Sequence, residues 1–139
     1  MPDDFARLIW AINKAGQAFF ADRLAPRGLG AGQYPLLSLL YMRDGLSQEE
    51  IADRLRIDKA AVAKSVRRLI EEGYANRRGD EVDGRVKRVR LTAKARRAKQ
   101  ALEAIEAEWR SILLAGFDEA EAGALCGCLK RLAQNAASR

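Results

Sequence analysis

Cationic side chains at helical spacing are the first residues of this sequence that suggest a chemical role. At about 100° per residue of helix, Lys64, Arg67 and Arg68 share one side of a segment that lies between Asp58 and Gly73. Ammonium and guanidinium groups on such a face pair with phosphate oxygens. The outer side of the segment is small and basic, and it carries Lys59, Ala60, Ala61, Lys64, Arg67 and Arg68. We therefore expect a helix that contacts nucleic acid; an ordinary helical hairpin with a solvated face is the alternative.

A hairpin is predicted directly after this helix. Residues 74–78 and 86–91 alternate between apolar and polar types, and Val89 and Leu91 point one way in the second run. Residues 79–85 between the two runs are polar and include two glycines. The tip of the hairpin should therefore stay in solvent.

Arg85 at this tip is a single long cation on a flexible arm. Such a side chain suits the narrow minor groove of A·T-rich DNA, which concentrates negative potential. Lys87 follows it on the second strand. We expect Asp83 to brace the hairpin by pairing with Arg77 or Arg78.

The charge balance favours a polyanionic partner. Residues 54–92 hold twelve Lys and Arg against six Asp and Glu, a net charge of +6. The whole chain of 139 residues holds 25 against 19, which is also +6, so the remainder sums to zero. A generic solvated surface would not concentrate the excess in one segment, and double-stranded DNA is the expected partner.

The composition argues against an enzyme. Histidine is absent, which excludes Ser-His and Cys-His nucleophile pairs and removes the most frequent zinc ligand. The glycine-rich residues 28–32 follow no predicted strand, so they indicate a turn between helices rather than a dinucleotide loop. We expect no catalysis, no metal site and no cofactor.

Cys126 and Cys128 are the two cysteines of the chain. Helical residues two apart point about 200° away from each other, so a disulfide within the helix would require unwinding. One interpretation is that both are small buried apolar residues in a reducing cytoplasm. The other is a redox sensor in which Cys126 near a twofold axis forms a bond between subunits.

Local signals define the two helices around the basic face. Ser47 precedes Glu50 by the three residues of a capping box, and Asp58 can cap a second helix that Gly73 ends. Residues 56–58 leave room only for a sharp turn. The inward positions of the second helix are Val62, Val66, Leu69 and Ile70. Two such helices resemble a helix-turn-helix, whose second helix enters a major groove about 12 Å wide.

A family resemblance rests on these same residues. The run Asp83-Gly84-Arg85-Val86-Lys87-Arg88-Val89-Arg90-Leu91-Thr92 resembles the wing signature D-x-R-x-x-x-V-x-L-T of the MarR family of bacterial winged-helix regulators (multiple antibiotic resistance regulators). It follows residues 47–52 and 69–74 at the distance that this family shows. The resemblance implies a mainly α fold, a winged helix-turn-helix with a two- to three-stranded wing plus terminal helices that form a dimerisation lobe.

The resemblance also implies a function. Such proteins are homodimers that bind a pseudo-palindromic operator, usually as repressors, and are released by a small molecule or by oxidation. By position, Arg85 would enter the minor groove and Ser47 would lie near a phosphate. The residues expected in or beside the major groove are Ala60, Ala61, Lys64, Ser65 and Arg68. Alanines stand where many members have hydroxyl residues, so DNA shape should supply more of the discrimination.

The terminal helices carry apolar stripes that need a partner. We expect residues 1–30 and 93–139 to pair with the same helices of a second copy around a DNA-binding lobe of residues 31–92, all within one folded unit. Folding back onto the chain's own core as a monomer is the alternative. A possible effector pocket is left unassigned, because aromatic residues at helical spacing are usually core. Its candidates are Trp10, Phe19, Tyr34, Tyr41 and Trp109.

Location and rival functions complete the expectations. No run is apolar over the roughly 18 residues of a membrane span, and the N-terminus does not resemble a signal peptide, so we expect a cytoplasmic protein without membrane contact. A protein-interaction module whose basic face binds an acidic partner is one rival function. A sequence-indifferent nucleoid protein is the other, and the alanines of the second helix favour it.

Overall fold

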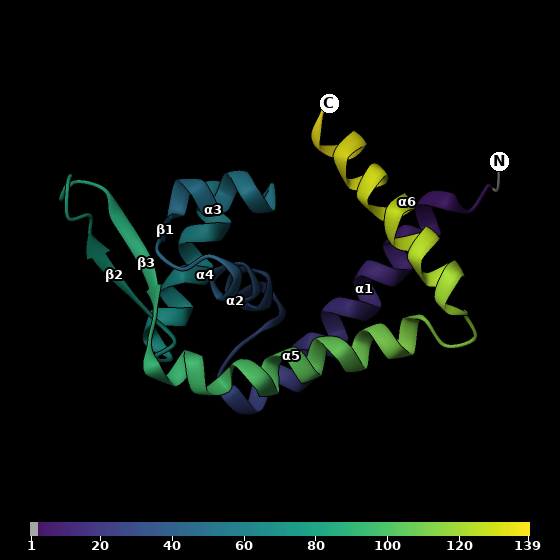
Figure 1. The fold of residues 1–139 in the computed structure, drawn as a ribbon, viewed down its shortest axis with the longest axis horizontal. Coiled ribbons are helices and arrows are strands. Elements are labelled where there is room, and N and C mark those ends of the chain that lie inside the picture. The colour runs from purple at the N-terminus through teal and green to yellow at the C-terminus, as the bar shows by residue number, and fades with distance from the viewer. Residues whose placement is uncertain (1–2) are drawn as a thin grey trace. The chain divides into compact units, whose positions relative to one another are not determined.

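The computed structural model describes residues 3–139, and the fold is mainly helical with one small sheet (Figure 1). The elements are α1 (Phe5–Leu24), the 3-10 turns η1 (Ala25–Arg27) and η2 (Ala31–Gln33), α2 (Tyr34–Met42), β1 (Leu46–Ser47), α3 (Gln48–Leu55), α4 (Lys59–Glu71), β2 (Ala75–Gly79), β3 (Lys87–Leu91), α5 (Ala93–Leu113) and α6 (Glu119–Ala137). The chain divides into two compact units, one ending at Ile105 and one from Glu106 to Arg139. Helix α5 contributes to both units.

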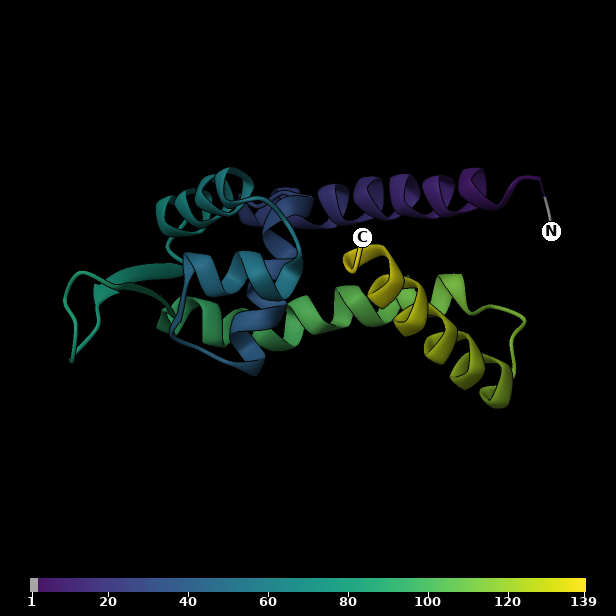
Figure 2. The same ribbon diagram turned by 90° about the horizontal axis from the view of Figure 1, so that it is seen from above.

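The sheet has three antiparallel strands in the order β1-β3-β2. The β2–β3 hairpin, called the wing below, pairs Ala75 with Leu91 at its base and Gly79 with Lys87 near its tip. Strand β1 is only two residues long and pairs Leu46 with Val89. The wing extends away from the helices of its unit (Figure 2). The fold class predicted from the sequence, a winged helix-turn-helix with additional terminal helices, is confirmed.

The core of the first unit is aliphatic and centres on α2. Leu36, Leu37 and Leu40 are fully buried because this helix is apolar on most of its sides. Residues from every neighbouring element pack around it: Leu24, Ile51, Val62, Val66, Leu69, Val89 and Leu102. Burial of side chains of this size contributes about 1.5–3 kcal/mol each. This core fixes the positions of α3, α4 and the wing.

Side-chain caps begin the helices where the sequence predicts them. The Ser47 hydroxyl accepts a hydrogen bond from the Glu50 amide at 3.1 Å, and the Asp58 carboxylate accepts one from the Ala61 amide at 2.7 Å. Thr92 caps α5 and Asp118 caps α6 in the same way. Helix α2 begins at Tyr34, directly after the 3-10 turn η2.

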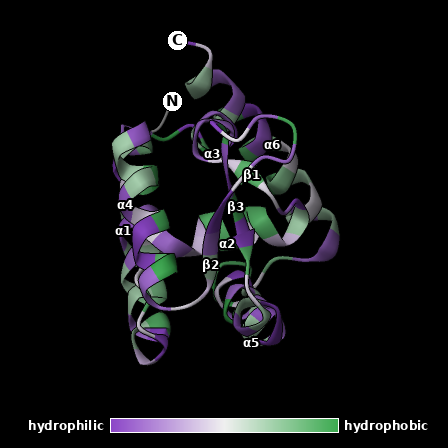
Figure 3. Cartoon of the chain, turned by 90° about the vertical axis from the view of Figure 1, so that its left-hand side faces the viewer, coloured by the Kyte–Doolittle hydropathy of each residue, from purple (hydrophilic) through white to green (hydrophobic). Residues whose placement is uncertain are grey.

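Helices α1 and α6 keep much of their apolar surface in solvent within a single chain, and apolar and polar residues alternate along their turns (Figure 3). No residue of α6 is buried. The exposed large apolar residues of these helices include Phe5, Leu8, Ile9, Ile12, Leu125, Leu129 and Leu132. Across residues 3–139, no helix combines the length and the apolar character needed to cross a membrane.

The two cysteines share the exposure of α6. Cys126 and Cys128 are both exposed in the single chain, and the buried pair and the redox sensor both stay hypotheses.

Candidate nucleic-acid interface

A left-handed residue makes the turn between α3 and α4. Arg56 adopts a φ of 56°, and its amide donates to the Ala52 carbonyl. The amide of Ile57 donates to the same carbonyl at 3.3 Å. This turn ends α3 within one residue, and Asp58 then starts α4. The two helices therefore lie against each other as a helix-turn-helix.

Helix α4, called the recognition helix below, has an apolar inner side and a basic outer side. Val62, Val66 and Leu69 are fully buried, as the sequence predicts, while Ile70 is half-buried. The outer side exposes Lys59, Ala60, Ala61, Lys64, Arg67 and Arg68. Lys59 also lies 3.6 Å from the Glu49 carboxylate, an exposed pair that contributes little to stability.

Ser65 corrects the placement expected for it beside the major groove. It is nearly buried, and its hydroxyl donates to the carbonyl of Gly32 at 3.3 Å. Arg68 is exposed, but its Nε donates to the carbonyl of Gly28 at 2.8 Å. Both side chains therefore bind the segment between α1 and α2. Ser65 lies on the helical side that faces the core, in line with Val62 and Leu69.

The wing tip presents Arg85 to solvent, with its side chain 92% exposed. Asp83 orients it: the Arg85 Nε lies 3.1 Å from Oδ1 of Asp83, and Nη2 lies 3.3 Å from Oδ2. This ion pair also lowers the pKa of Asp83. The expected pairing of Asp83 with Arg77 or Arg78 is therefore wrong. Arg77 instead donates from Nε to the Gln48 side chain at 2.9 Å.

Asp80 is the carboxylate that braces the wing, and sequence reasoning missed it. It accepts hydrogen bonds from the amides of Val82 and Asp83 and from Arg88 Nε at 2.7 Å. The hydrogen bond from Arg88 and those from the two amides lower the pKa of Asp80 to about 2. The carboxylate therefore stays ionised, and the turn at the start of the wing loop stays closed.

Arg88 connects the wing to the rest of the first unit. Its Nη1 donates to the Gly45 carbonyl at 3.0 Å and lies 3.3 Å from the Glu50 carboxylate on α3. A hydrogen bond from Arg88 to Asp80 raises the pKa of the arginine further. One guanidinium thus contacts the wing loop, the turn before β1 and the first turn of α3. Alternation along residues 86–91 predicts that Arg88 points away from the side of Val89, but it does not predict the partners of Arg88.

The structure brings the expected DNA-binding residues, apart from Ser65, onto exposed or half-exposed surface of one unit. Ser47 lies at the N-terminus of α3, half-exposed, and Lys87 is exposed at the start of β3. Charge-assisted contacts to phosphate are the chemistry that these groups support. Their arrangement combines a basic helix face with a basic finger.

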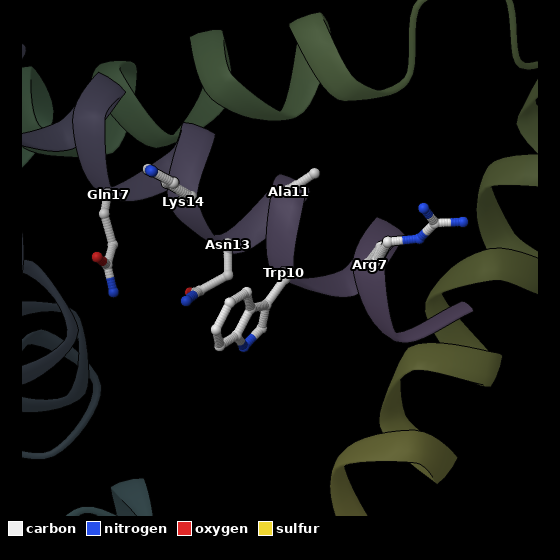
Figure 4. Close-up of a pocket in the computed structure, with 6 residues that line it drawn as sticks. All are labelled: Arg7, Trp10, Ala11, Asn13, Lys14 and Gln17. Carbon is white, nitrogen blue, oxygen red and sulfur yellow. The ribbon is translucent and has the colours of Figure 1, made fainter. Parts of the chain in front are cut away.

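A hollow of about 420 Å³ lies against α1 (Figure 4). Trp10, Asn13 and Gln17 project from the same side of the helix in this view, and Arg7 and Lys14 also line the hollow. Trp10 is 81% exposed. Of the five aromatic residues considered for an effector pocket, Trp10 is the one among the lining residues. Tyr34 instead stacks on Phe20, and Tyr41 donates to the Ala95 carbonyl, with its pKa raised to about 12 by burial.

Comparisons with known proteins agree with this architecture. The sequence profile of the MarR family matches residues 27–86. The HTH-type transcriptional regulator YdgJ of Bacillus subtilis strain 168, which is uncharacterised, is 30% identical over 94% of this chain and 79% of its own. A MarR transcriptional regulator from Methanosarcina mazei Go1 is 33% identical, with a TM-score of 0.90 over 98% of this chain and 92% of the other.

A further solved structure shares the fold at lower identity. It is a MarR family regulator from Listeria monocytogenes complexed with 26mer DNA, 24% identical, with a TM-score of 0.91 over 99% of this chain and 91% of the other. The identity and the coverage of the Methanosarcina protein and of YdgJ, taken with the family profile, decide the family. The chain belongs to the MarR family of transcriptional regulators.

Proposed function

We propose that this protein is a dimeric repressor of transcription that binds a pseudo-palindromic operator in double-stranded DNA. The observation that carries the proposal is the basic outer side of the recognition helix beside a braced wing with an exposed Arg85. A MarR family relative of the same fold has been solved with 26mer DNA, which supports the same partner here. Lys64, Arg67 and Arg85 are the residues that we assign to contact with DNA.

Exposed apolar surface supports the dimer. The large apolar side chains left in solvent on α1 and α6 would cost solubility in a monomer, because contiguous exposed apolar patches mark interaction sites. A second copy covers them economically. A twofold axis then places two recognition helices about 34 Å apart, the length of one turn of DNA.

Release of DNA by a small molecule or by oxidation completes the proposal. The hollow beside Trp10 supports the first route, and the exposed Cys126 and Cys128 support the second. Addition of hydrogen peroxide, or of aromatic compounds, to a preformed complex should lower the anisotropy of a labelled duplex if either route operates.

Salt dependence tests the proposed DNA binding. Cationic contacts to phosphate release counterions, so affinity for a labelled duplex should fall by at least about tenfold between 50 and 200 mM salt. Fluorescence anisotropy of a duplex selected by the protein from a random-sequence library measures this. A random duplex of equal length is the control. Equal affinity for both duplexes would favour the nucleoid alternative, and binding to neither would favour a protein-interaction module.

The affinity for DNA should not depend on pH between about 5.5 and 7.5. The sequence has no histidine, the one side chain whose ordinary pKa falls in this range. Asp80, which braces the wing, also stays ionised here: its pKa is about 2 against an ordinary 3.8. The stability that ionised Asp80 contributes to the fold is therefore present above about pH 4 and is lost as the pH falls toward 2. Anisotropy titrations of the untagged protein across the range should therefore superimpose. A change of more than about threefold would reveal a titrating group that this interpretation omits.

A further inference from the structure

The segment that joins α1 to α2 is attached to the recognition helix at several points. Arg68 Nε donates to the Gly28 carbonyl at 2.8 Å, and the Ser65 hydroxyl donates to the Gly32 carbonyl at 3.3 Å. Just past the recognition helix, the Tyr74 hydroxyl donates to the Arg27 carbonyl at 3.4 Å. We call residues 27–33 the latch segment. Three backbone carbonyls of this segment are thus acceptors for side chains that lie on, or directly after, one helix.

The latch segment itself is held in one conformation. Gly28 has a φ of 75°, a region that glycine occupies without strain, and the Glu72 carboxylate lies where a Cβ of residue 28 would project. Gln33 is nearly buried and accepts the Gly30 amide at 2.6 Å through Oε1. These contacts restrict the conformations that the latch segment can adopt.

The other end of the latch segment is fixed to α1. Leu24, the last residue of α1, is fully buried, and its carbonyl accepts the Leu29 amide at 3.2 Å. Phe20, one turn earlier on α1, stacks on Tyr34 at a centroid distance of 4.7 Å. The C-terminal end of α1 and the latch segment therefore form one packed body.

We propose that Arg68 and Ser65 are positioning residues that hold the recognition helix to the C-terminal end of α1 through the latch segment. They act on DNA through the orientation of the helix and not through contact with a base or a phosphate. The proposal rests on the proposed DNA binding. Its consequence is that a displacement of α1 shifts the recognition helix, and that DNA bound to the recognition helix stabilises the latch segment.

The two roles open to Arg68 predict different behaviour. Each phosphate contact releases about one counterion when DNA binds. Loss of that contact therefore lowers the slope of log affinity against log salt concentration by about one, and it weakens binding to all sequences equally. Loss of a positioning contact leaves the salt slope unchanged. It weakens the selected duplex more than a random one, because discrimination depends on the orientation of the helix.

Three variants separate these roles. Arg68→Met removes the bond to Gly28, and Ser65→Ala removes the bond to Gly32 without any change of charge. Arg67→Met is the matched control, since Arg67 is the neighbouring exposed cation and the substitution removes the same charge. The probe is a fluorescein-labelled duplex of about 30 base pairs, selected by the wild-type protein, which accommodates two half-sites one turn apart. A random duplex and a salt series complete each titration.

We expect Arg68→Met to reduce the ratio of affinity for the selected duplex to affinity for the random duplex by about tenfold, and Ser65→Ala to reduce it by about threefold. Both variants should keep the salt slope of the wild-type protein. Arg67→Met should lower the salt slope by about two, one for each subunit of the dimer, and leave the affinity ratio unchanged. Hydrogen exchange should slow in residues 27–33 of the wild-type protein on addition of DNA, and should not slow in the Ser65→Ala, Arg68→Met double variant.

Two results would overturn the proposal. One is a salt slope for Arg68→Met that falls as it does for Arg67→Met, with an unchanged affinity ratio. The other is a Ser65→Ala protein whose ratio of selected-duplex to random-duplex affinity equals that of the wild-type protein. The Ser65→Ala variant keeps the test valid if Arg68→Met fails to fold. Failure of the wild-type protein to bind any duplex would overturn the proposed function itself, which is a distinct outcome.

Discussion

Glutamate in place of Leu129 is expected to convert the dimer to a monomer and to lower the affinity for a duplex with two half-sites by about 10²–10⁴-fold. Leu129 is 54% exposed in the single chain and lies on the stripe that Leu125 and Leu132 share. A carboxylate there would be desolvated at the proposed dimer interface, which is unfavourable without a cationic partner. Since each monomer holds one recognition helix, the second half-site would no longer be bound intramolecularly.

Gln134→Glu is the matched control for this variant. Gln134 is exposed and lies about 180° around α6 from the Leu129 stripe, so the substitution adds the same charge away from the expected interface. Analytical ultracentrifugation at about 10 µM protein, a concentration well above the Kd of a stable dimer, measures the assembly and anisotropy measures the affinity. A Leu129→Glu protein that is monomeric and still binds with wild-type affinity would show that the two-fold arrangement is not required.

Removal of the Arg85 side chain should have the second largest effect. Arg85→Ala should weaken binding to the selected duplex by about 1–3 kcal/mol, because a groove contact of this kind is lost. The melting temperature should change little, since the side chain is 92% exposed and its ion pair with Asp83 is a surface pair. Discrimination between A·T-rich and G·C-rich sequence under the wing tip should fall with the affinity.

Arg78→Ala provides the comparison for Arg85→Ala. Arg78 is an exposed cation of the same hairpin, located on β2 opposite Arg88 and away from the tip, so its loss changes the net charge equally. Anisotropy and thermal unfolding of both variants decide the role of Arg85. If Arg85→Ala lost as much fold stability as binding, the arginine would be a structural residue, and the assignment to the minor groove would fail.

The elements of the fold were predictable because their signals are local. Ser47, Asp58, Thr92 and Asp118 each cap a helix with a bond to an amide three residues later, so residue type and spacing suffice. Gly73 ends the recognition helix with a φ of 81° for the same local reason. Alternation on β3 likewise predicted which side of the strand is buried.

The contacts that orient the site were not predictable, because their partners are far apart in sequence. The bond between Arg68 and Gly28 spans 40 positions, and that between Arg88 and Gly45 spans 43. Nothing in the helical spacing of Arg68 distinguishes a guanidinium bound to a loop carbonyl from one in solvent. Asp80 and Asp83 are both acids of one loop, and only the geometry of the turn decides which arginine each one binds.

The two alanines on the outer side of the recognition helix leave this protein open to retargeting. Ala60 and Ala61 are exposed, and neither side chain has a polar atom that holds the fold together. Longer polar side chains at these positions would gain access to base edges at little expense in folding free energy, since exposed helical substitutions change stability by only a few tenths of a kcal/mol. New sequence preferences could then be acquired by one or two point changes while the core, the wing and the latch segment stay intact.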